Sequence, residues 1–500
     1  MAVTKSLHIW FLGIACFGVI SIGLISFQIH QAQHHAATSK SLHSVLQASK
    51  QSVRQKAQPI KKTSSSNTSE VPPYHVVFST SCEPQQNWES YVFFYHAWKV
   101  GQPGTVTRIA SGCSAEQGME RMEFHKTHIA TMNSNFYLHL TPDFSRGADY
   151  IRYGKARYKY MNKPYGLLHW MDTTFRLNTT KYDKRVEDGI VILMDPDMVL
   201  LRPIVHDYSH QNVLFVEDKP ATKVVKHGYP MAQQDGYLTN QWMYLNVSYI
   251  TNGGNIRHVK ETDGPKHYNA GPPYLATVRD MYQMARLWTD YAPRVYEIHP
   301  KLFAEMFGYI FAATQLYLPH TFIRSIVVST TETRNREGWP YIRDYPDQDV
   351  CRPLPTTPEP FQVTTDITST TALPIALHYC KRYLLEKWFF SKYRLKKHYV
   401  SCETPILQLP PMDLVLRNYT YSFQPPPHGY YQKNPHTPWE DVVANLTHPG
   451  QAKKEAFMIC QLIRAVNEAA EYFKRTACVH HPNTNWNRNY TFFNDPDAGF

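Results

Sequence analysis

Two aspartates, Asp195 and Asp197, stand one residue apart directly after the apolar run 189–194. Two carboxylates spaced in this way can share one divalent cation and the diphosphate that the cation binds. The cation would act as a Lewis acid and stabilise negative charge on a departing phosphate. The alternative is that both aspartates only cap a turn.

The same Asp-x-Asp pattern occurs twice more, at 347–349 in a Tyr/Pro-rich stretch and at 495–497 in the last six residues. Only the copy at 195–197 follows a predicted strand, and ligands of α/β sheets gather at the carboxyl ends of strands. A third ligand is expected from a distant segment. His378 closes another predicted strand and has suitable chemistry, although it can equally be a packing histidine.

The elements that position these residues follow from hydrophobic periodicity. The alternation of strand, helix and strand near the start of the folded part predicts an α/β fold. A helix opens at Lys163-Pro164, because proline suits a first helical turn. The predicted strands cover residues 75–81, 105–110, 189–194, 212–216 and 374–378, and the other predicted helices cover residues 88–100, 275–291, 302–316 and 451–477, the last packed on the outside of the domain.

The charge pattern argues against nucleic-acid binding. The net charge is +11, but residues 1–73 alone carry +6, which leaves +5 for the remainder. A nucleic-acid footprint requires basic residues gathered on a folded face. A protein that binds membrane surfaces through the Lys-rich segment remains an alternative.

The N-terminal segment predicts a membrane anchor. Residues 9–27 contain no charge and match the length of a bilayer core. The alternative is a cleaved signal peptide, although such a peptide normally has a shorter apolar region and a small-residue cleavage site, for which Ala36 and Ala37 are a poor match. Six N-x-Ser/Thr sequons follow, which favours a lumenal orientation of the rest. Seven cysteines beyond the anchor allow up to three disulfides with one left over. The expected organisation is a cytoplasmic tail at 1–8, the anchor at 9–27, a flexible stem at 28–73, a catalytic domain at 74–405 and an extension with a C-terminal helix at 406–500.

Eight motifs follow one another along the chain in a recognisable order. They are HVVFSTSC at 75–82 with NW at 87–88, GTVTR at 104–108, NKPYG at 162–166 with HW at 169–170, ILMDPD at 192–197, YNAGPPY at 268–274, AEMFGY at 304–309, EGW at 337–339, and HYCKRY at 378–383 with WFF at 388–390. Together they resemble the plant and algal peptidyl serine α-galactosyltransferases and, less closely, the hydroxyproline O-arabinosyltransferases. The resemblance covers about residues 74–403 and the helix at 460–478.

The resemblance implies a GT-A-like fold, in which helices flank a mixed sheet. It also implies a type II membrane protein of the Golgi or endoplasmic reticulum, a UDP-sugar donor and a divalent cation, expected to be Mn²⁺. It implies that Asp195, Asp197 and His378 hold the cation. The residues that it implies as donor or acceptor contacts are Arg108, Lys163, His169, Asn269 and Trp339.

The implied reaction transfers galactose from UDP-galactose to serine in Ser/Pro- or hydroxyproline-rich polypeptides with retained configuration. Retention needs a covalent carboxylate intermediate or attack on the face that the leaving group vacates. Glu305 and Asp235 are the candidate nucleophiles. Polyproline II chains dock on aromatic grooves, so Trp170, Trp242 and Trp339 are candidate stacking surfaces, although a single tryptophan is more often core. The alternatives are an arabinosyltransferase using UDP-arabinofuranose and a non-catalytic, lectin-like lumenal scaffold.

Overall fold

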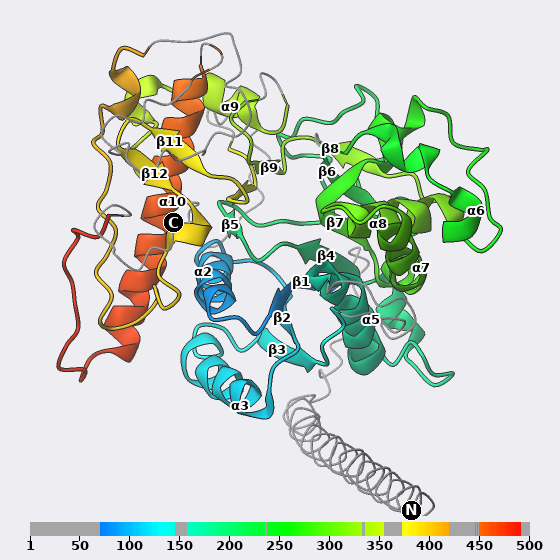
Figure 1. The fold of residues 1–500 in the computed structure, drawn as a ribbon, viewed down its shortest axis with the longest axis horizontal. Helices are drawn as coiled ribbons and strands as arrows, with labels where there is room; N and C mark the ends of the chain where they lie inside the picture. The colour runs from blue at the N-terminus through cyan, green and yellow to red at the C-terminus, as the bar shows by residue number, and fades with distance from the viewer. Residues whose placement is uncertain are drawn as a thin grey trace, which may run out of the picture. The chain divides into compact units, whose positions relative to one another are not determined.

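The computed structural model describes residues 71–145, 158–235, 238–332, 336–354, 373–419, 446, 448 and 450–491. The chain divides into two compact units. In the first, only Ser114–Arg121 is described, and it contains most of helix α3 (Ala115–Phe124). The second unit, Thr68–Cys113 with Met122–Phe500, contains all other described residues and the elements discussed below (Figure 1).

The predicted anchor at 9–27 lies outside the described residues, as does most of the predicted stem at 28–73. Within the described part, no helix combines the length and the apolar character that crossing a membrane requires.

A seven-stranded mixed sheet forms the centre of the second unit, in the order β3-β2-β1-β4-β7-β6-β8. The first four strands in this order run parallel, β7 runs antiparallel to both β4 and β6, and β8 is parallel to β6. The predicted mixed α/β sheet is therefore confirmed. The strands are β1 (Tyr74–Ser81), β2 (Thr105–Ser111), β3 (Phe136–Thr141), β4 (Ile190–Met194), β6 (Met231–Gln234), β7 (Ala270–Thr277) and β8 (Thr321–Ile323).

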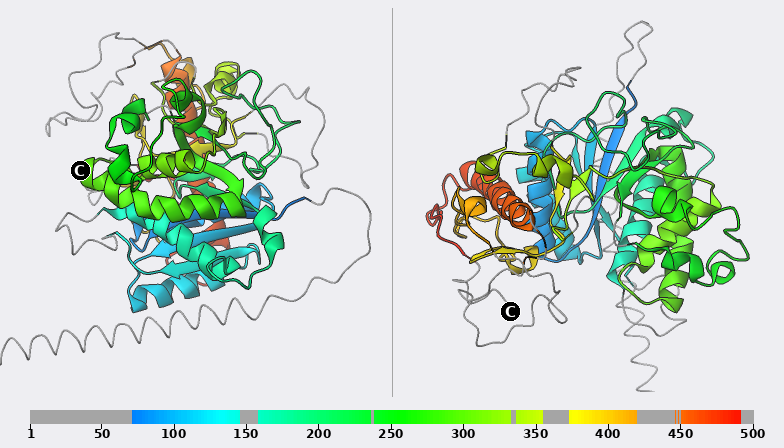
Figure 2. Two further views of the ribbon diagram at one scale, coloured as in Figure 1. Left: turned by 90° about the vertical axis from the view of Figure 1, so that its right-hand side faces the viewer. Right: turned by 90° about the horizontal axis from the view of Figure 1, so that it is seen from above.

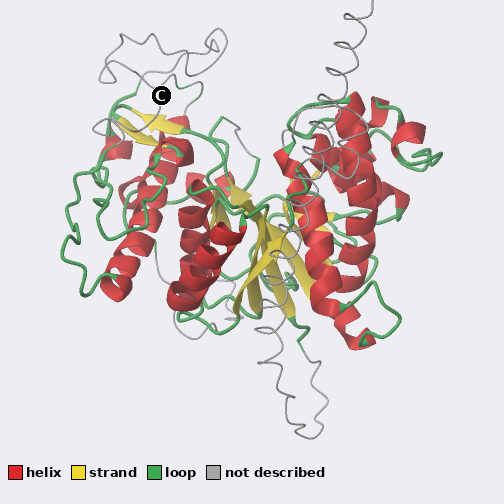
Figure 3. Cartoon of the chain, turned by 60° about the horizontal axis from the view of Figure 1, so that its bottom comes forward, coloured by secondary structure: helices red, strands yellow, loops and turns green. Residues whose placement is uncertain are grey.

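Helices cover both faces of this sheet (Figure 3). Side chains of β4 alternate between two apolar clusters: Val191 and Leu193 join one, and Ile192 and Met194 join the other. A strand buried on both faces reads as a continuous apolar run, which explains residues 190–194. One cluster contains residues of α5 (Asn162–Phe175), α7 (Val278–Ile298) and α8 (Ala304–Gln315), and the other contains residues of α2 (Gln85–Lys99) and α10 (Gln451–Ala477).

Helices α7 and α8 lie side by side (Figure 2). Gly308 permits this close approach, because a Cβ at that position would lie 2.9 Å from Cα of Ala292. Glu305, a candidate site residue, lies in the first turn of α8, so this packing also helps to position Glu305.

A second, three-stranded sheet has β10 (Ala376–His378) between β5 (Met198–Leu200) and β9 (Val327–Val328). A hairpin of β11 (Tyr383–Leu385) and β12 (Trp388–Phe390) follows and leads into a 3₁₀ turn, η7 (Lys392–Arg394). The remaining short helices are η1 (His125–Ile129), η2 (Lys159–Met161), η3 (Lys184–Asp188), η4 (Asn240–Tyr244), α6 (Val247–Ile250), η5 (Gly264–Tyr268), α9 (Trp339–Arg343), η6 (Asp347–Asp349) and η8 (Leu414–Leu416).

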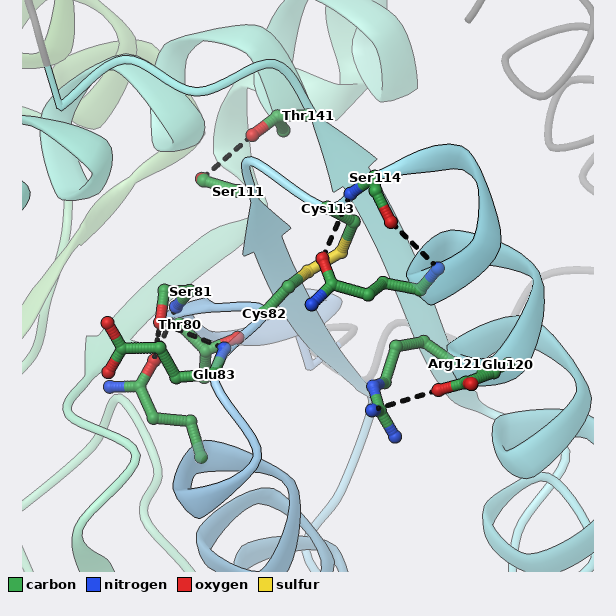
Figure 4. The surroundings of a disulfide bond; sticks show 12 residues. Thr80, Ser81, Cys82, Glu83, Ser111, Cys113, Ser114, Glu120, Arg121 and Thr141 are labelled. Atoms are coloured by element: carbon green, nitrogen blue, oxygen red, sulfur yellow. Dashed lines mark hydrogen bonds and ion pairs between the residues drawn. A yellow bond between two sulfur atoms is a disulfide. The ribbon is translucent and has the colours of Figure 1, made fainter. Parts of the chain in front are cut away.

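Three disulfides join distant segments, as the cysteine count allowed. Cys82–Cys113 links the segments that follow β1 and β2 (Figure 4). Cys351–Cys460 and Cys402–Cys478 both attach helix α10 to the chain that precedes it. Among the described cysteines, Cys380 is the one outside a disulfide.

Most predicted elements are present, and three details were wrong. Residues 212–216 form no strand, and only Phe215 makes an isolated bridge, to Ile323. The helix predicted from residue 275 begins at Val278, because β7 continues to Thr277, whose hydroxyl then caps the helix by accepting the Asp280 N–H at 3.2 Å. Helix α10 has the predicted bounds, but most of its side chains are buried because α2, α9, β11 and β12 pack around it.

Candidate functional site

The acidic pair lies where β4 ends in the central sheet. β4 finishes at Met194, and Asp195, Pro196 and Asp197 connect it to β5. Asp197 is buried, with 4% of its surface exposed, whereas Asp195 is partly exposed. β4 pairs in parallel with β1, so the pair stands at the carboxyl edge of the parallel half of the sheet, where ligands bind in such folds.

His378 is brought to this pair by the second sheet. β10 pairs antiparallel with β5 so that His378 faces Met198, and the Tyr379 N–H donates to the Asp197 carbonyl at 3.0 Å. The His378 Nε2 atom lies 3.4 Å from Asp197 Oδ1 and 3.7 Å from Asp195 Oδ2. Ligand atoms of the three residues lie within 4.8 Å of one another. The structure thus brings together the three residues predicted to hold a cation.

Two lysines hold the other oxygens of the acidic pair. Lys163 Nζ lies 2.9 Å from Asp195 Oδ1, and Lys392 Nζ lies 2.5 Å from Asp197 Oδ2. In each carboxylate, one oxygen therefore contacts a lysine and the other lies near His378. Two carboxylate oxygens and one imidazole nitrogen form a ligand set that suits Mn²⁺ and related divalent ions. The residues present fit a divalent cation.

The charges of this cluster are strongly coupled. Burial alone would raise the pKa of Asp197, but Lys392 and His378 outweigh burial and hold the pKa of this carboxyl well below its usual range. Burial alone would lower the pKa of His378, but Cys380 and Asp197 raise it well above its usual value. A cation that binds here would take the place of the His378 proton, because a ligating imidazole must be neutral.

Glu305 completes an ion-pair chain on the side of helices α5 and α8. Its Oε1 lies 3.1 Å from Lys163 Nζ, and its backbone is fixed by the Trp288 indole N–H, which donates to the Glu305 carbonyl at 2.6 Å. Burial raises the pKa of Glu305, and the Lys163 ammonium opposes this shift. Burial would lower the pKa of Lys163, but Asp195 and Glu305 raise it. In this geometry Glu305 is the partner of Lys163, which suits a positioning role better than the predicted role of nucleophile.

Two members of the site, Lys392 and Glu89, were not predicted. Lys392 begins the turn η7, and Glu89 lies in α2 with 2% of its surface exposed. Burial raises the pKa of Glu89, and the nearby Lys392 ammonium opposes this shift. The sequence held one signal for Glu89: it is a carboxylate within the apolar face of a helix, and such residues are rarely buried unless paired.

The other predicted contacts occupy varied surroundings. Arg108 is buried, and it donates to Thr80 Oγ1 at 2.9 Å and to Asn87 Oδ1 at 3.0 Å. Its charge acts on Glu89, so it lies within electrostatic reach of the site. His169 pairs with His139, with 2.9 Å between Nδ1 and Nε2.

Asn269 and Asp235 lie together beside β7. The Asn269 side chain accepts the Trp242 indole N–H at 2.9 Å and donates to the Leu238 carbonyl at 3.0 Å, which leaves it little capacity for a ligand. Asp235 accepts the Leu238 N–H at 3.1 Å. Asp235 also acts electrostatically on Tyr274, as do Glu305 and Asp195, so it borders the same region.

The three candidate stacking tryptophans are buried, which is the alternative that the sequence favoured for a single tryptophan. Trp339 and Trp242 are 0% exposed and Trp170 is 3% exposed. The Trp339 indole N–H donates to the Thr330 carbonyl at 2.8 Å, and the Lys454 ammonium covers the ring at 5.3 Å from its centroid. A sugar cannot reach these rings. Each tryptophan is a core residue, and Trp339 is not a donor or acceptor contact in this geometry.

Two curated relatives bear directly on the sequence resemblance. A peptidyl serine alpha-galactosyltransferase of Arabidopsis thaliana is 25% identical over 252 residues, which cover 49% of this chain and 26% of the relative. One of Chlamydomonas reinhardtii is 25% identical over 290 residues, which cover 54% of this chain and 34% of the relative. The chain is related to the peptidyl serine alpha-galactosyltransferases. It spans about a third or less of the length of these two relatives, and no family model matches it.

Solved glycosyltransferases also align with this relative of the galactosyltransferases. The galactosyltransferase LgtC, in complex with donor and acceptor sugar analogues, aligns at 10% identity and a TM-score of 0.31, covering 61% of this chain and 87% of LgtC. The bifunctional glycosyltransferase WbbM aligns at 9% identity and a TM-score of 0.31, covering 67% of this chain and 48% of WbbM. At these scores no argument rests on the structural likeness.

Proposed function

We propose that the chain is a metal-dependent glycosyltransferase with a GT-A-like nucleotide-sugar site. The observation that carries the proposal is the convergence of Asp195, Asp197 and His378 at the carboxyl edge of the central sheet. This ligand set suits a divalent cation bound to a diphosphate. The sequence relationship to peptidyl serine alpha-galactosyltransferases supports UDP-galactose as the donor and serine of Ser/Pro- or hydroxyproline-rich polypeptides as the acceptor.

The residues of the chain would divide the work as follows. Asp195, Asp197 and His378 would hold the cation, proposed to be Mn²⁺, and this ion would supply Lewis-acid stabilisation of the departing diphosphate. Lys163 and Lys392 hold the acidic pair in place through the oxygens that do not face His378. Glu305 contacts Lys163, Glu89 interacts electrostatically with Lys392, and both glutamates are buried.

We propose that the reaction retains the configuration of the sugar and that the acceptor attacks the face from which the diphosphate departs. A covalent intermediate would need a carboxylate that is available to the sugar. Oε1 of Glu305 pairs with the Lys163 ammonium, which stabilises the carboxylate and argues against that route for this residue, although Oε2 has no hydrogen-bond partner among the described residues. Asp235 stays a prediction as a nucleophile.

A location in the Golgi or endoplasmic reticulum, with residues 9–27 as an anchor, is part of the proposal. Three disulfides support an oxidising compartment. The four described sequons also support it, because their asparagines are all exposed and would be accessible to glycosylation: Asn178, Asn246, Asn418 and Asn489.

A donor assay tests the proposal. The full chain, purified in detergent micelles, is incubated with Mn²⁺, a peptide of alternating serine and hydroxyproline, and either UDP-galactose or UDP-arabinofuranose. Mass spectrometry is expected to find galactose on serine, lost on addition of a chelator and lost in Asp197→Asn. Asp349→Asn, in the second Asp-x-Asp sequence, is the matched control and is expected to stay active. Transfer of arabinose alone would refute the donor, and no transfer from either sugar would refute catalysis.

A further inference from the structure

Two series of side chains with alternating charge meet at the acidic pair. On one side Asp195 contacts Lys163, which contacts Glu305. On the other side Asp197 contacts Lys392, which interacts electrostatically with Glu89. Each carboxylate of the pair is therefore already balanced by an ammonium group before any cation is bound.

Hydrogen bonds from neighbouring residues fix the second series, which contains Asp197, Lys392 and Glu89. Gln85, in the first turn of α2, donates from Nε2 to the Lys392 carbonyl at 3.0 Å and to Glu89 Oε1 at 3.4 Å. The hydroxyl of Ser391 caps the turn η7 by accepting the Tyr393 N–H at 3.3 Å. Only 14% of the Lys392 side chain is exposed, so water screens its charge weakly. Glu89 Oε2 has no hydrogen-bond partner among the described residues.

We propose that Lys392, whose ammonium contacts Asp197, makes cation binding at the acidic pair depend on the nucleotide, an inference that rests on the proposed function. A dication that enters beside Asp197 meets the Lys392 charge at short range, and this repulsion lowers its affinity. A diphosphate brings negative charge to the same place and cancels the repulsion. The cation and the nucleotide then bind far better together than apart, which is a coupling free energy between two ligands.

Glu89 has the opposite electrostatic effect, and this separates the proposal from a merely structural role. Its carboxylate shares the hydrogen-bonding side chain of Gln85 with the Lys392 carbonyl and offsets part of the lysine charge. Loss of the Lys392 charge should tighten cation binding in the absence of nucleotide, whereas loss of the Glu89 charge should weaken it. Two substitutions that only loosen the packing would shift affinity in the same direction.

Isothermal titration of Mn²⁺ into the full chain in detergent micelles, without and with UDP, measures both effects. Lys392→Met keeps the length of the side chain and removes its charge. It is expected to bind Mn²⁺ alone about tenfold more tightly than the wild type and to gain less from UDP. Glu89→Gln is expected to bind Mn²⁺ alone several-fold more weakly, by about the effect of one partly screened charge. Lys387→Met, in the exposed turn between β11 and β12, is the matched control and should change neither value.

Circular dichroism melts establish that each variant is folded, and Lys392→Arg, which keeps the charge, should retain the coupling if Lys392→Met does not fold. Weaker or unchanged Mn²⁺ binding by Lys392→Met, or a shift in the same direction by both variants, would overturn the inference. If the wild type binds Mn²⁺ but UDP has no effect, the proposed donor fails, while the shift in Mn²⁺ affinity alone still decides the role of Lys392. Absence of Mn²⁺ binding in the presence of UDP would refute the proposed function itself.

Discussion

Replacing Lys163 by methionine should leave the carboxylates of Asp195 and Glu305 without the positive charge that compensates them. Lys163 Nζ contacts Asp195 Oδ1 at 2.9 Å and Glu305 Oε1 at 3.1 Å, and only 13% of its side chain is exposed. Removal of one partner from a buried ion pair costs about 3–5 kcal/mol, because the other charge stays buried without compensation. We therefore expect Lys163→Met to lower the free energy of unfolding by about 3–5 kcal/mol near pH 7.

The same variant should show a distinctive dependence on pH. Burial already raises the pKa of Glu305, and loss of the Lys163 ammonium removes the charge that opposes this shift. A carboxyl whose pKa is higher in the folded state stabilises the fold below its unfolded pKa, and this stabilisation is lost as pH rises through the folded pKa. The deficit of Lys163→Met should therefore shrink as pH falls. Adding Glu305→Gln should recover part of it at neutral pH, because the uncompensated charge is removed.

Urea denaturation followed by tryptophan fluorescence at several pH values measures these differences. Lys159→Met is the control, because Lys159 lies in the preceding turn η2 and is exposed. A loss below about 1 kcal/mol at neutral pH, as is typical of exposed ion pairs, would refute the buried network. A deficit that does not change with pH would refute the role assigned to Glu305.

Three further results are expected. Mn²⁺ with UDP at about a hundred times the dissociation constant should stabilise the wild type by about 2.7 kcal/mol in urea denaturation, and Asp197→Asn should lose this gain while Asp349→Asn keeps it. Burial raises the pKa of Glu455 to about 7, so stability should fall as pH rises through that value, and Glu455→Gln should remove up to about 3 kcal/mol of this dependence in a pH series of unfolding curves. Trp339→Ala should cost about 3–5 kcal/mol of unfolding free energy while leaving Mn²⁺ and UDP-galactose affinity intact by calorimetry, whereas a ring that stacks on the galactose would show the reverse.

The parts of the site that could be predicted are those whose position follows from a local pattern. β4 is buried on both faces, so it reads as an unbroken apolar run that stops at Asp195. The strand that ends at His378 is recognisable in the same way. Ligands of α/β sheets bind at the carboxyl ends of strands, so both segments could be assigned to one site from the sequence.

The ion pairs around the acidic pair could not be predicted, because nothing local encodes them. Lys392 lies 195 residues from Asp197, and Lys163 lies 142 residues from Glu305. Lys392 follows a short hairpin whose strands of three residues give little periodicity. The hairpin packs against α10, a helix that begins more than 50 residues later in the chain.

The aromatic residues illustrate a choice that the sequence left open between a sugar-binding surface and the core. The chain contains 10 tryptophans, and an aromatic excess suits sugar and polyproline recognition. The structure buries Trp170, Trp242 and Trp339 instead. Exposure depends on tertiary packing and not on residue type, so the sequence could not separate a stacking surface from a core ring.

The location of the cation tests the central claim most directly. Crystals of the chain grown with Mn²⁺ and UDP would be measured at a wavelength where manganese scatters anomalously. We predict one strong peak between Asp195 Oδ2, Asp197 Oδ1 and His378 Nε2, with the diphosphate as a further ligand. A peak elsewhere, or UDP bound with no manganese at these three atoms, would contradict the account.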